Sequence, residues 1–190
     1  MKQSFKLFIL FFSISAVFAS CIKNDDTVFT QPLVEIDWST YNARTSGYPF
    51  PLLTRVPQEP GRGVITSNLI YGTGAAVTDP VLSRTYTDTI RMRINLVGPQ
   101  MSTAQTFQMR VAQEFTTGKE GSATTPGAHF ELIDKTVTIP ANQSFGFARW
   151  VVRNPGPTNN LPVNVVFQLV GNGAVPVNEN YQYIGWSITQ

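Results

Sequence analysis

The chain has 190 residues, of which 42% are hydrophobic and only 14% are charged, with 14 Lys plus Arg against 12 Asp plus Glu. This composition is too apolar for a disordered chain and too poor in basic residues for a protein that binds nucleic acid. The chain contains one Cys and one His. An internal disulfide and a cysteine-based zinc site are therefore excluded, and any mechanism that needs a histidine base must use His129.

Residues 1–20 have the features of a secretory signal peptide. Lys2 and Lys6 give a short basic start, and an apolar run from Leu7 to Ala19 follows. As a helix this run would be about 20 Å long at ~1.5 Å per residue, which is too short for a hydrocarbon core of ~30 Å. We therefore predict a segment that is removed rather than one that spans a membrane.

The predicted signal ends at Phe18-Ala19-Ser20-Cys21, with small residues directly before the single Cys. This stretch resembles the lipobox of bacterial lipoproteins, in which the Cys thiol is acylated and becomes the first residue of the mature chain. The resemblance implies that Cys21 is lipidated and that several acyl chains anchor the protein, since stable anchoring takes at least two such signals. The alternative is a secreted protein that is cleaved after an Ala-x-Ala-like site and keeps a free thiol.

Removal of residues 1–20 would leave 12 Lys plus Arg against 12 Asp plus Glu, because Lys2 and Lys6 leave with the signal. A neutral chain has no long-range field that attracts nucleic acid or anionic lipid, so we expect membrane attachment through acyl chains alone. Residues 21–31 are predicted to be a polar tether. A lysine and an acidic pair within residues 22–27 resemble the signal that sends Bacteroidota lipoproteins to the outer face of the outer membrane. This implies exposure at the cell surface, with the periplasmic face as the alternative.

Residues 32–190 are predicted to form one all-β domain. Apolar residues at every second position, which line one face of a strand, occur over residues 34–38, 89–96, 163–170 and 184–188. In the third of these runs Val166 and Val170 add a second apolar face, which indicates a strand that is buried on both sides. Trp38, Trp150 and Trp186 lie in apolar strand patterns and are expected in the core.

Residues 100–117 fit two interpretations. Apolar residues at 104, 107, 111 and 115 would share a helix face, whereas Phe107, Met109 and Val111 would alternate along a strand. We favour the strand because no helical signal appears elsewhere in the mature chain. Residues 47–63 contain four prolines and are expected to be a long irregular connection. About seven to eight strands with turns between them predict an immunoglobulin-like β-sandwich of antiparallel strands.

Several short motifs resemble the Calx-β family. They are Gly121-Ser122-Ala123, Gly127-Ala128-His129-Phe130, Val137-Thr138-Ile139-Pro140-Ala141-Asn142 and Val165-Val166-Phe167-Gln168-Leu169. Calx-β domains bind calcium through acidic residues, but His129 stands where the family has an acid, and a neutral imidazole is a poor ligand for a hard cation. The stretch Asn95 to Gln100 resembles lipoproteins that are encoded beside SusC/SusD glycan-uptake systems. This resemblance implies a SusC/SusD-like complex as a partner.

The residues give no support for catalysis. No nucleophile motif surrounds His129, which is expected to be a polar turn residue. Glu131 and Asp134, predicted at a hairpin edge, and Asp79 and Asp88, in loops or at strand starts, are expected to be solvated surface acids rather than a glycosidase pair. We therefore expect no enzymatic activity, no metal and no cofactor.

Three pairs of residues are candidates for glycan binding. Tyr181 and Tyr183 would point outward from one strand with their rings about 7 Å apart, a spacing suited to stacking on sugar rings. The other pairs are Tyr48 with Phe50, in the proline-rich connection, and Arg91 with Arg93, which together with Arg110 could form a basic stripe for acidic sugars.

The sequence therefore predicts a non-catalytic, lipid-anchored outer-membrane protein that is accessory to polysaccharide binding and uptake. A structural protein–protein interaction module of the cell surface is one alternative. A glycan hydrolase is the other, and released sugars would identify it.

Overall fold

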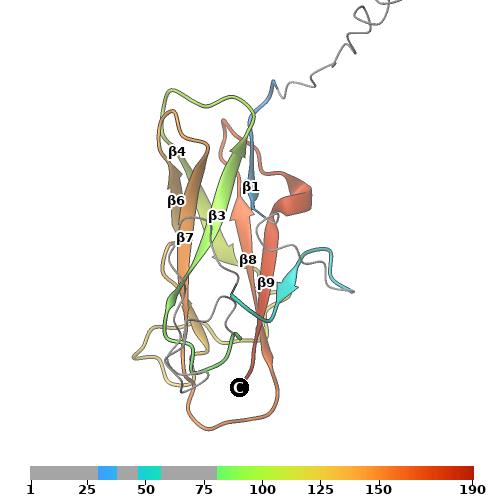
Figure 1. The fold of residues 1–190 in the computed structure, drawn as a ribbon, viewed down its shortest axis with the longest axis vertical. Helices are drawn as coiled ribbons and strands as arrows, with labels where there is room; N and C mark the ends of the chain where they lie inside the picture. Colours follow the sequence, from blue (N-terminus) through green and yellow to red (C-terminus); the bar gives the residue numbers. More distant parts are fainter. Residues whose placement is uncertain (1–29, 38–46, 57–80) are drawn as a thin grey trace, which may run out of the picture.

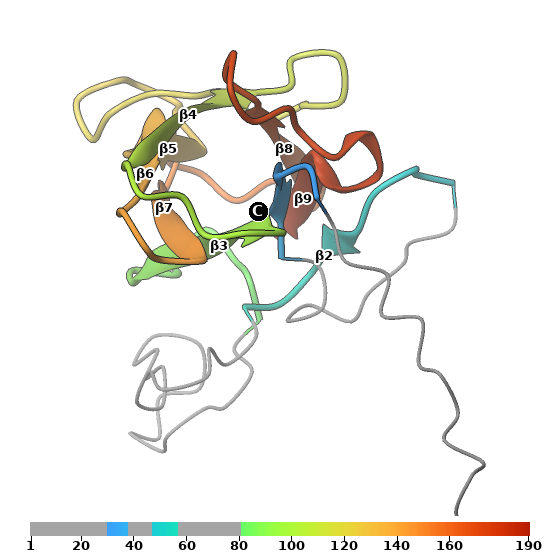
Figure 2. The same ribbon diagram turned by 90° about the horizontal axis from the view of Figure 1, so that it is seen from above.

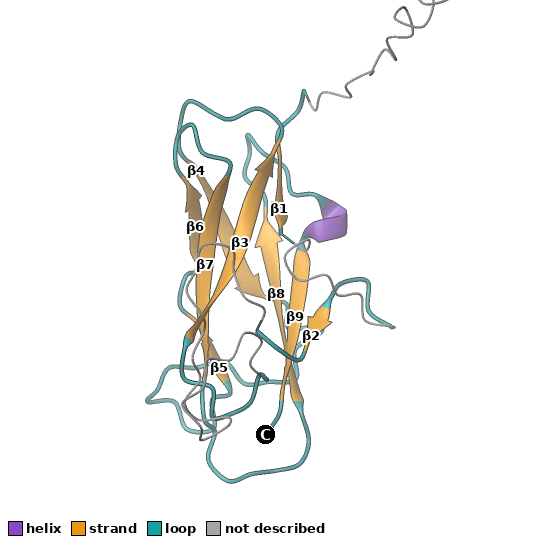
Figure 3. Cartoon of the chain, in the orientation of Figure 1, coloured by secondary structure: helices purple, strands orange, loops and turns teal. Residues whose placement is uncertain are grey.

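The computed structural model describes residues 30–37, 47–56 and 81–190. Within these ranges the chain forms nine strands and one short 3₁₀ turn, and the strands make two sheets that pack face to face (Figures 1 and 3). No helix in the described part is long and apolar enough to cross a membrane. The predictions for residues 1–20, Cys21, most of the tether, Trp38 and Asp79 lie outside the described residues.

The first sheet is antiparallel throughout and has the order β1-β3-β7-β5. Its strands are β1 (Leu33–Ile36), β3 (Thr89–Val97), β7 (Phe145–Val152) and β5 (Phe130–Leu132). Arg91 of β3 stands opposite Arg149 of β7. The side chains of β3 alternate strictly between buried and half-buried, as the sequence predicted.

The second sheet has the order β2-β9-β8-β4-β6. Its strands are β2 (Leu52–Leu53), β9 (Tyr183–Ile188), β8 (Val163–Val170), β4 (Gln105–Val111) and β6 (Thr136–Ile139). The all-β sandwich is thus confirmed, with one difference, because β2 pairs with β9 in parallel. The added strand comes from the predicted irregular connection, and it lies at the periphery of the molecule in Figure 2.

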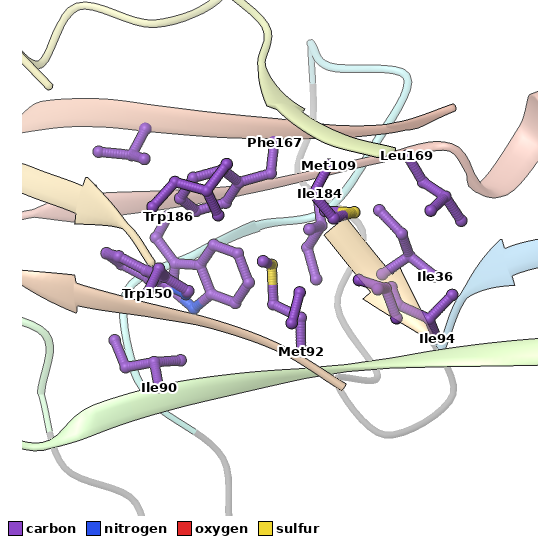
Figure 4. Close-up of a cluster of buried hydrophobic side chains, with 14 of the residues drawn as sticks. Ile36, Ile90, Met92, Ile94, Met109, Trp150, Phe167, Leu169, Ile184 and Trp186 are labelled. Atoms are coloured by element: carbon purple, nitrogen blue, oxygen red, sulfur yellow. The ribbon is translucent and has the colours of Figure 1, made fainter. Parts of the chain in front are cut away.

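The core lies between the two sheets and is centred on three aromatic side chains, Trp150, Phe167 and Trp186. Their ring centroids are 5.0 to 5.9 Å apart and the rings are inclined to one another, an arrangement that the ring quadrupoles favour. Figure 4 shows Met92 and Met109 packed beside them. Trp150 and Trp186 are fully buried, which confirms them as core residues.

The ambiguous segment 100–117 contains the strand β4 and no helix. Phe107 and Met109 point into the core, as expected for alternation along a strand. β8 is buried on both sides, also as predicted, since its outer residue Val166 is covered by Phe50 and Ala112.

The prediction of a hairpin at Glu131 and Asp134 is wrong. β5 belongs to the first sheet and β6 to the second, so residues 133–135 cross from one sheet to the other. The apolar alternation is the same in a hairpin and in such a crossing, and only the packing of the sheets distinguishes them.

The sandwich has two distinct ends, which the strand register defines. At one end Leu33 of β1 pairs with Val97 at the end of β3. At the other end Thr89, the first residue of β3, pairs with Val151 near the end of β7. The described chain enters at the first end and the C-terminus lies at the second (Figure 1). The nine residues of β3 separate the two ends by about 30 Å.

Candidate functional site

Tyr181 and Tyr183 do not form the predicted pair on one strand. Tyr181 ends the 3₁₀ turn η1 (Glu179–Tyr181), and β9 begins only at Tyr183. Asn178 caps this turn, because its side-chain oxygen accepts a hydrogen bond from the N–H of Asn180 at 3.2 Å. The capped turn contains Tyr181, which therefore lies outside β9, so the expected 7 Å pair on one strand is not formed.

Tyr48, Phe50, Phe115 and Tyr183 instead form one aromatic cluster on the outer face of the second sheet. Phe50 lies at its centre, with ring centroids 5.4 Å from Tyr48, 5.1 Å from Phe115 and 5.8 Å from Tyr183. Phe50 is only 2% exposed, whereas Tyr48 is 39% exposed. The cluster therefore fastens residues 47–56 to the sheet, and Phe50 offers no ring face to a sugar.

Arg91 and Arg93 project from the outer face of β3, as predicted. The Arg91 guanidinium lies 3.7 Å from the ring centroid of Phe147, and that of Arg93 lies 4.3 Å from the ring centroid of Phe145. Arg93 also forms an ion pair with the buried Asp37, at 3.6 Å. Both guanidinium groups are thus engaged in contacts within the protein.

Arg110 does not extend this basic stripe. It lies on β4, in the other sheet, and donates from Nε to the side-chain oxygen of Gln168 at 2.7 Å. The acids are similarly engaged: Asp134 accepts two hydrogen bonds from the Arg149 guanidinium, at 2.7 and 2.9 Å, which lower the pKa of its carboxyl. Asp88 accepts from the N–H of Thr89 at 2.7 Å.

The structure shows a cavity that the sequence did not predict, at the end of the sandwich where the C-terminus lies. Its volume is about 540 Å³, and three segments that are far apart in the chain surround it. The lining residues are Arg84, Thr85, Tyr86, Thr87, Ser122, Ala123, Thr125, Ala128, Val151, Val152, Arg153 and Asn154. We refer to it as the end cavity.

The first wall of the end cavity, residues 84–87, is held in place by backbone hydrogen bonds on both sides. The N–H of Leu82 donates to the carbonyl of Thr54 at 2.9 Å, and the N–H of Arg84 donates to the carbonyl of Thr189 at 2.9 Å. A tight turn follows, closed by the N–H of Tyr86 and the carbonyl of Ser83 at 2.9 Å. The wall therefore depends on the C-terminal end of the chain and on the segment after β2.

The second wall is the loop 118–129, which is braced by His129. The imidazole Nδ1 accepts from the N–H of Lys119 at 2.9 Å, and the N–H of His129 donates to the carbonyl of Lys119 at 2.8 Å. The Lys119 ammonium donates to the carbonyl of Pro126 at 2.8 Å. Burial and the nearby Lys119 charge lower the pKa of His129, which favours the neutral imidazole that this acceptor role requires.

The third wall is the end of β7 and the residues that follow it. The N–H of Arg153 donates to the carbonyl of His129 at 2.8 Å, which ties this wall to the second. The guanidinium of Arg153 donates from Nη2 to the carboxylate of Glu131. Its Nε is buried and has no hydrogen-bond partner in the described part of the chain.

The polar groups of the lining are hydroxyl, amide and guanidinium groups. Threonine and serine hydroxyls come from the first and second walls, and Asn154 and Arg153 come from the third. No Asp, Glu or Cys is among the described lining residues, and no three His, Cys, Asp or Glu residues gather anywhere in the described ranges. These groups donate and accept hydrogen bonds, as a ligand rich in hydroxyls requires.

Sequence patterns alone could not locate this cavity, because its walls lie about 20 residues or more apart along the chain. The available signals were the small and hydroxyl-bearing residues at 122–125 and the Arg-Asn pair at the end of β7.

No family model matches this chain, and no curated protein matches it significantly. Solved structures that resemble it include a two-domain protein of unknown function from Bacteroides fragilis, with 7% identity, a TM-score of 0.46 and coverage of 84% of this chain and 45% of that chain. A second is a protein of unknown function from Bacteroides ovatus, with 10% identity, a TM-score of 0.46 and coverage of 85% and 52%. A third is a candidate carbohydrate-binding protein from Bacteroides ovatus, with 8% identity, a TM-score of 0.40 and coverage of 55% and 32%. The chain thus spans about half or less of the length of each structure, and at these TM-scores the similarity carries no conclusion about function.

Proposed function

We propose that this chain is a non-catalytic, lipid-anchored outer-membrane protein that binds a glycan in the end cavity, as an accessory of a polysaccharide-uptake system. The observation on which the proposal rests is a cavity of about 540 Å³ whose lining combines alanine and valine side chains with hydroxyl, amide and guanidinium groups. This volume falls within the range of about 300 to 1,000 Å³ that is usual for small-ligand sites.

The chemistry of the lining fits a sugar. Each sugar hydroxyl both donates and accepts hydrogen bonds, and the threonine, serine and asparagine side chains of the cavity can do the same. The cavity is built from loops at the end of a rigid sandwich, a place where binding sites commonly lie.

The position of the cavity suits a protein that is anchored through Cys21. The described chain enters the sandwich at the end opposite to the cavity (Figure 1). The 13 residues from Cys21 to Leu33 could span at most about 45 Å when fully extended. With acyl chains on Cys21, the cavity would therefore be the part of the domain directed away from the membrane.

The absence of enzymatic activity is part of the proposal. A glycoside hydrolase generally needs two carboxyl groups that flank the bond to be cut. The described lining contains no acidic side chain, and Glu131, behind the third wall, is paired with Arg153.

The proposed partner is a SusC/SusD-like transporter complex, which the resemblance of Asn95 to Gln100 implies. β3 ends at Val97, so this stretch lies at the end of the sandwich opposite to the cavity. A partner docked there would leave the cavity open to a glycan.

The test compares two substitutions that introduce the same bulky side chain. Ala123→Trp places a ring in the cavity lining, whereas Ala174→Trp places one on an exposed residue at the opposite end. The purified mature lipoprotein in detergent is run in affinity gels that contain amylopectin, mannan, arabinoxylan, polygalacturonate or dextran sulfate. We expect at least one polysaccharide to retard the wild type and Ala174→Trp but not Ala123→Trp. Retardation by none of them, or equal retardation of both variants, would contradict the proposal.

A further inference from the structure

The charged side chains among the described lining residues of the end cavity are both arginines, Arg84 and Arg153. They come from different walls, Arg84 from the segment before β3 and Arg153 from the residue after β7. Since no lining residue in the described ranges is acidic, both guanidinium groups adjoin a space without an anion in its wall.

Arg84 is held in position while most of its donors stay available. Its Nη1 donates to the carbonyl of Gly156, and its own N–H is fixed by Thr189. Gly156 has a φ of 116°, in the region that favours glycine, and this conformation presents its carbonyl to the arginine. A guanidinium has five N–H donors, so one bond to a carbonyl leaves the rest of the planar group for a ligand.

Arg153 has a buried donor that lacks a hydrogen-bond partner in the described part of the chain. Its Nη2 is paired with Glu131, which orients the guanidinium, but its Nε is buried and has no hydrogen-bond partner in the described part of the chain. A buried N–H without a partner is unfavourable, and charged donors are the most costly of these groups. Arg153 is a lining residue of the end cavity, so a small shift of its guanidinium toward a bound acceptor would give this donor a partner.

We infer that the end cavity recognises an anionic group on the glycan, a carboxylate or a sulfate, through Arg84 and Arg153. This inference rests on the proposed function and names the class of sugar that the site takes. Guanidinium groups bind carboxylate and sulfate oxygens with paired, charge-assisted hydrogen bonds, which are about twice as strong as neutral ones.

The preference for an anionic glycan would come from the two arginines of the end cavity and not from the net charge of the protein. The mature chain from Cys21 has equal numbers of basic and acidic residues, so a polyanion is not attracted by the molecule as a whole. The arginines of the first sheet already have partners, since Arg91 lies over Phe147 and Arg149 is bonded to Asp134. Arg91 is thus a matched control with the same charge outside the cavity.

The experiment measures the affinity of the mature lipoprotein, in detergent, for three polysaccharides: dextran, dextran sulfate and polygalacturonate. Dextran is neutral, dextran sulfate contains sulfate alone, and polygalacturonate contains carboxylate alone. We expect binding to at least one of the two anionic probes, at least about tenfold tighter than to dextran and weakened by added NaCl. The probe that binds distinguishes sulfate from carboxylate.

Arg84→Gln should weaken that binding by about tenfold or more, the loss of about one charge-assisted hydrogen bond, whereas Arg91→Gln should leave it unchanged. Arg153→Lys keeps the charge but loses the Nε donor, and we expect a loss of similar size. Thermal melts of all variants confirm folding. Equal binding to dextran, or equal affinities of Arg84→Gln and Arg91→Gln, would overturn the inference. A third outcome is glycan binding that Ala123→Trp abolishes but that is equally tight for neutral and anionic probes. This outcome would support the proposed function and overturn the inference about anionic groups.

Discussion

Hydrogen bonds of single residues hold the walls of the end cavity together. His129 is the best example, because its neutral imidazole accepts from the N–H of Lys119 and its carbonyl receives the N–H of Arg153. The only histidine of the chain thus joins two walls of the cavity. The sequence predicted a polar turn residue at this position, but it could not predict the acceptor role.

This role predicts a pH dependence of stability. The pKa of His129 is lowered in the folded protein from its ordinary value of about 6.5, mainly by burial. Below pH 6.5 the unfolded chain therefore binds more protons at this residue than the folded chain, and stability falls as the pH falls toward the folded pKa. Above about pH 7.5 both states are neutral and the contribution is constant.

Thermal melts of the wild type and His129→Gln between pH 8 and pH 5 measure this effect. We expect the melting temperature of the wild type to fall toward pH 5 more steeply than that of the variant. Burial raises the pKa of Glu35, so its contribution to stability increases as the pH falls, which is the opposite of the His129 effect. The pKa of Asp134 is lowered, so protonation of this residue changes stability only below about pH 4. The difference between the two proteins therefore reports His129, and parallel curves would contradict its role as an acceptor.

Gly146 marks a close approach between the two sheets. A Cβ at this position would lie 2.5 Å from the carbonyl oxygen of Thr138, which belongs to the backbone of β6 and cannot move independently. We expect Gly146→Ala to lower the free energy of unfolding by about 1 to 3 kcal/mol, as other overpacking substitutions do. Gly173→Ala, which would meet nothing within 4 Å, is the control and should change it by less than about 0.5 kcal/mol. Urea unfolding measures both, and equal stabilities would show that the strands can separate.

At the scale of elements, the second sheet is extended by a segment with little regular structure of its own. β2 has only two residues, and its parallel pairing with β9 is supported by the aromatic cluster around Phe50. Alternation predicted the long strands, since β3, β4, β8 and β9 each bury apolar side chains at every second position. It could not predict β2, because two residues show no periodicity and their pairing depends on contacts with distant strands.

The aromatic cluster makes a prediction about this element. Phe50→Ala should lower the free energy of unfolding by about 3 to 5 kcal/mol, because it removes a ring that is 2% exposed and opens a void over Val166. Tyr48→Ala, which removes a ring that is 39% exposed, should cost about 1 kcal/mol or less. Urea unfolding compares them, and similar losses would mean that Phe50 does not anchor the segment.

At the scale of the whole molecule, the described chain enters the sandwich at the end opposite to the end cavity (Figure 1). The lipobox resemblance predicts that Cys21→Ser abolishes acylation and releases the protein from membranes, since a chain with equal numbers of basic and acidic residues is not attracted to anionic lipid. Fractionation of cells that express the wild type or the variant measures this. A matched Ser20→Ala variant should remain in the membrane fraction, and retention of Cys21→Ser there would contradict the lipid anchor.

The sequence by itself determined the sandwich class, the strands β3, β4, β8 and β9, the tryptophan core at Trp150 and Trp186 and the burial of β8 on both sides. These features follow from side-chain periodicity, which is local along the chain. The candidate site residues were predicted less well, because Tyr181 belongs to a capped turn, Tyr183 begins a strand, and Phe50 is buried. Only the tertiary structure decided the parallel β2, the crossing between β5 and β6 and the end cavity. Each of these depends on which distant segments pack together. Because the hydrophobic effect is non-directional, a local pattern of apolar residues does not specify which segments these are.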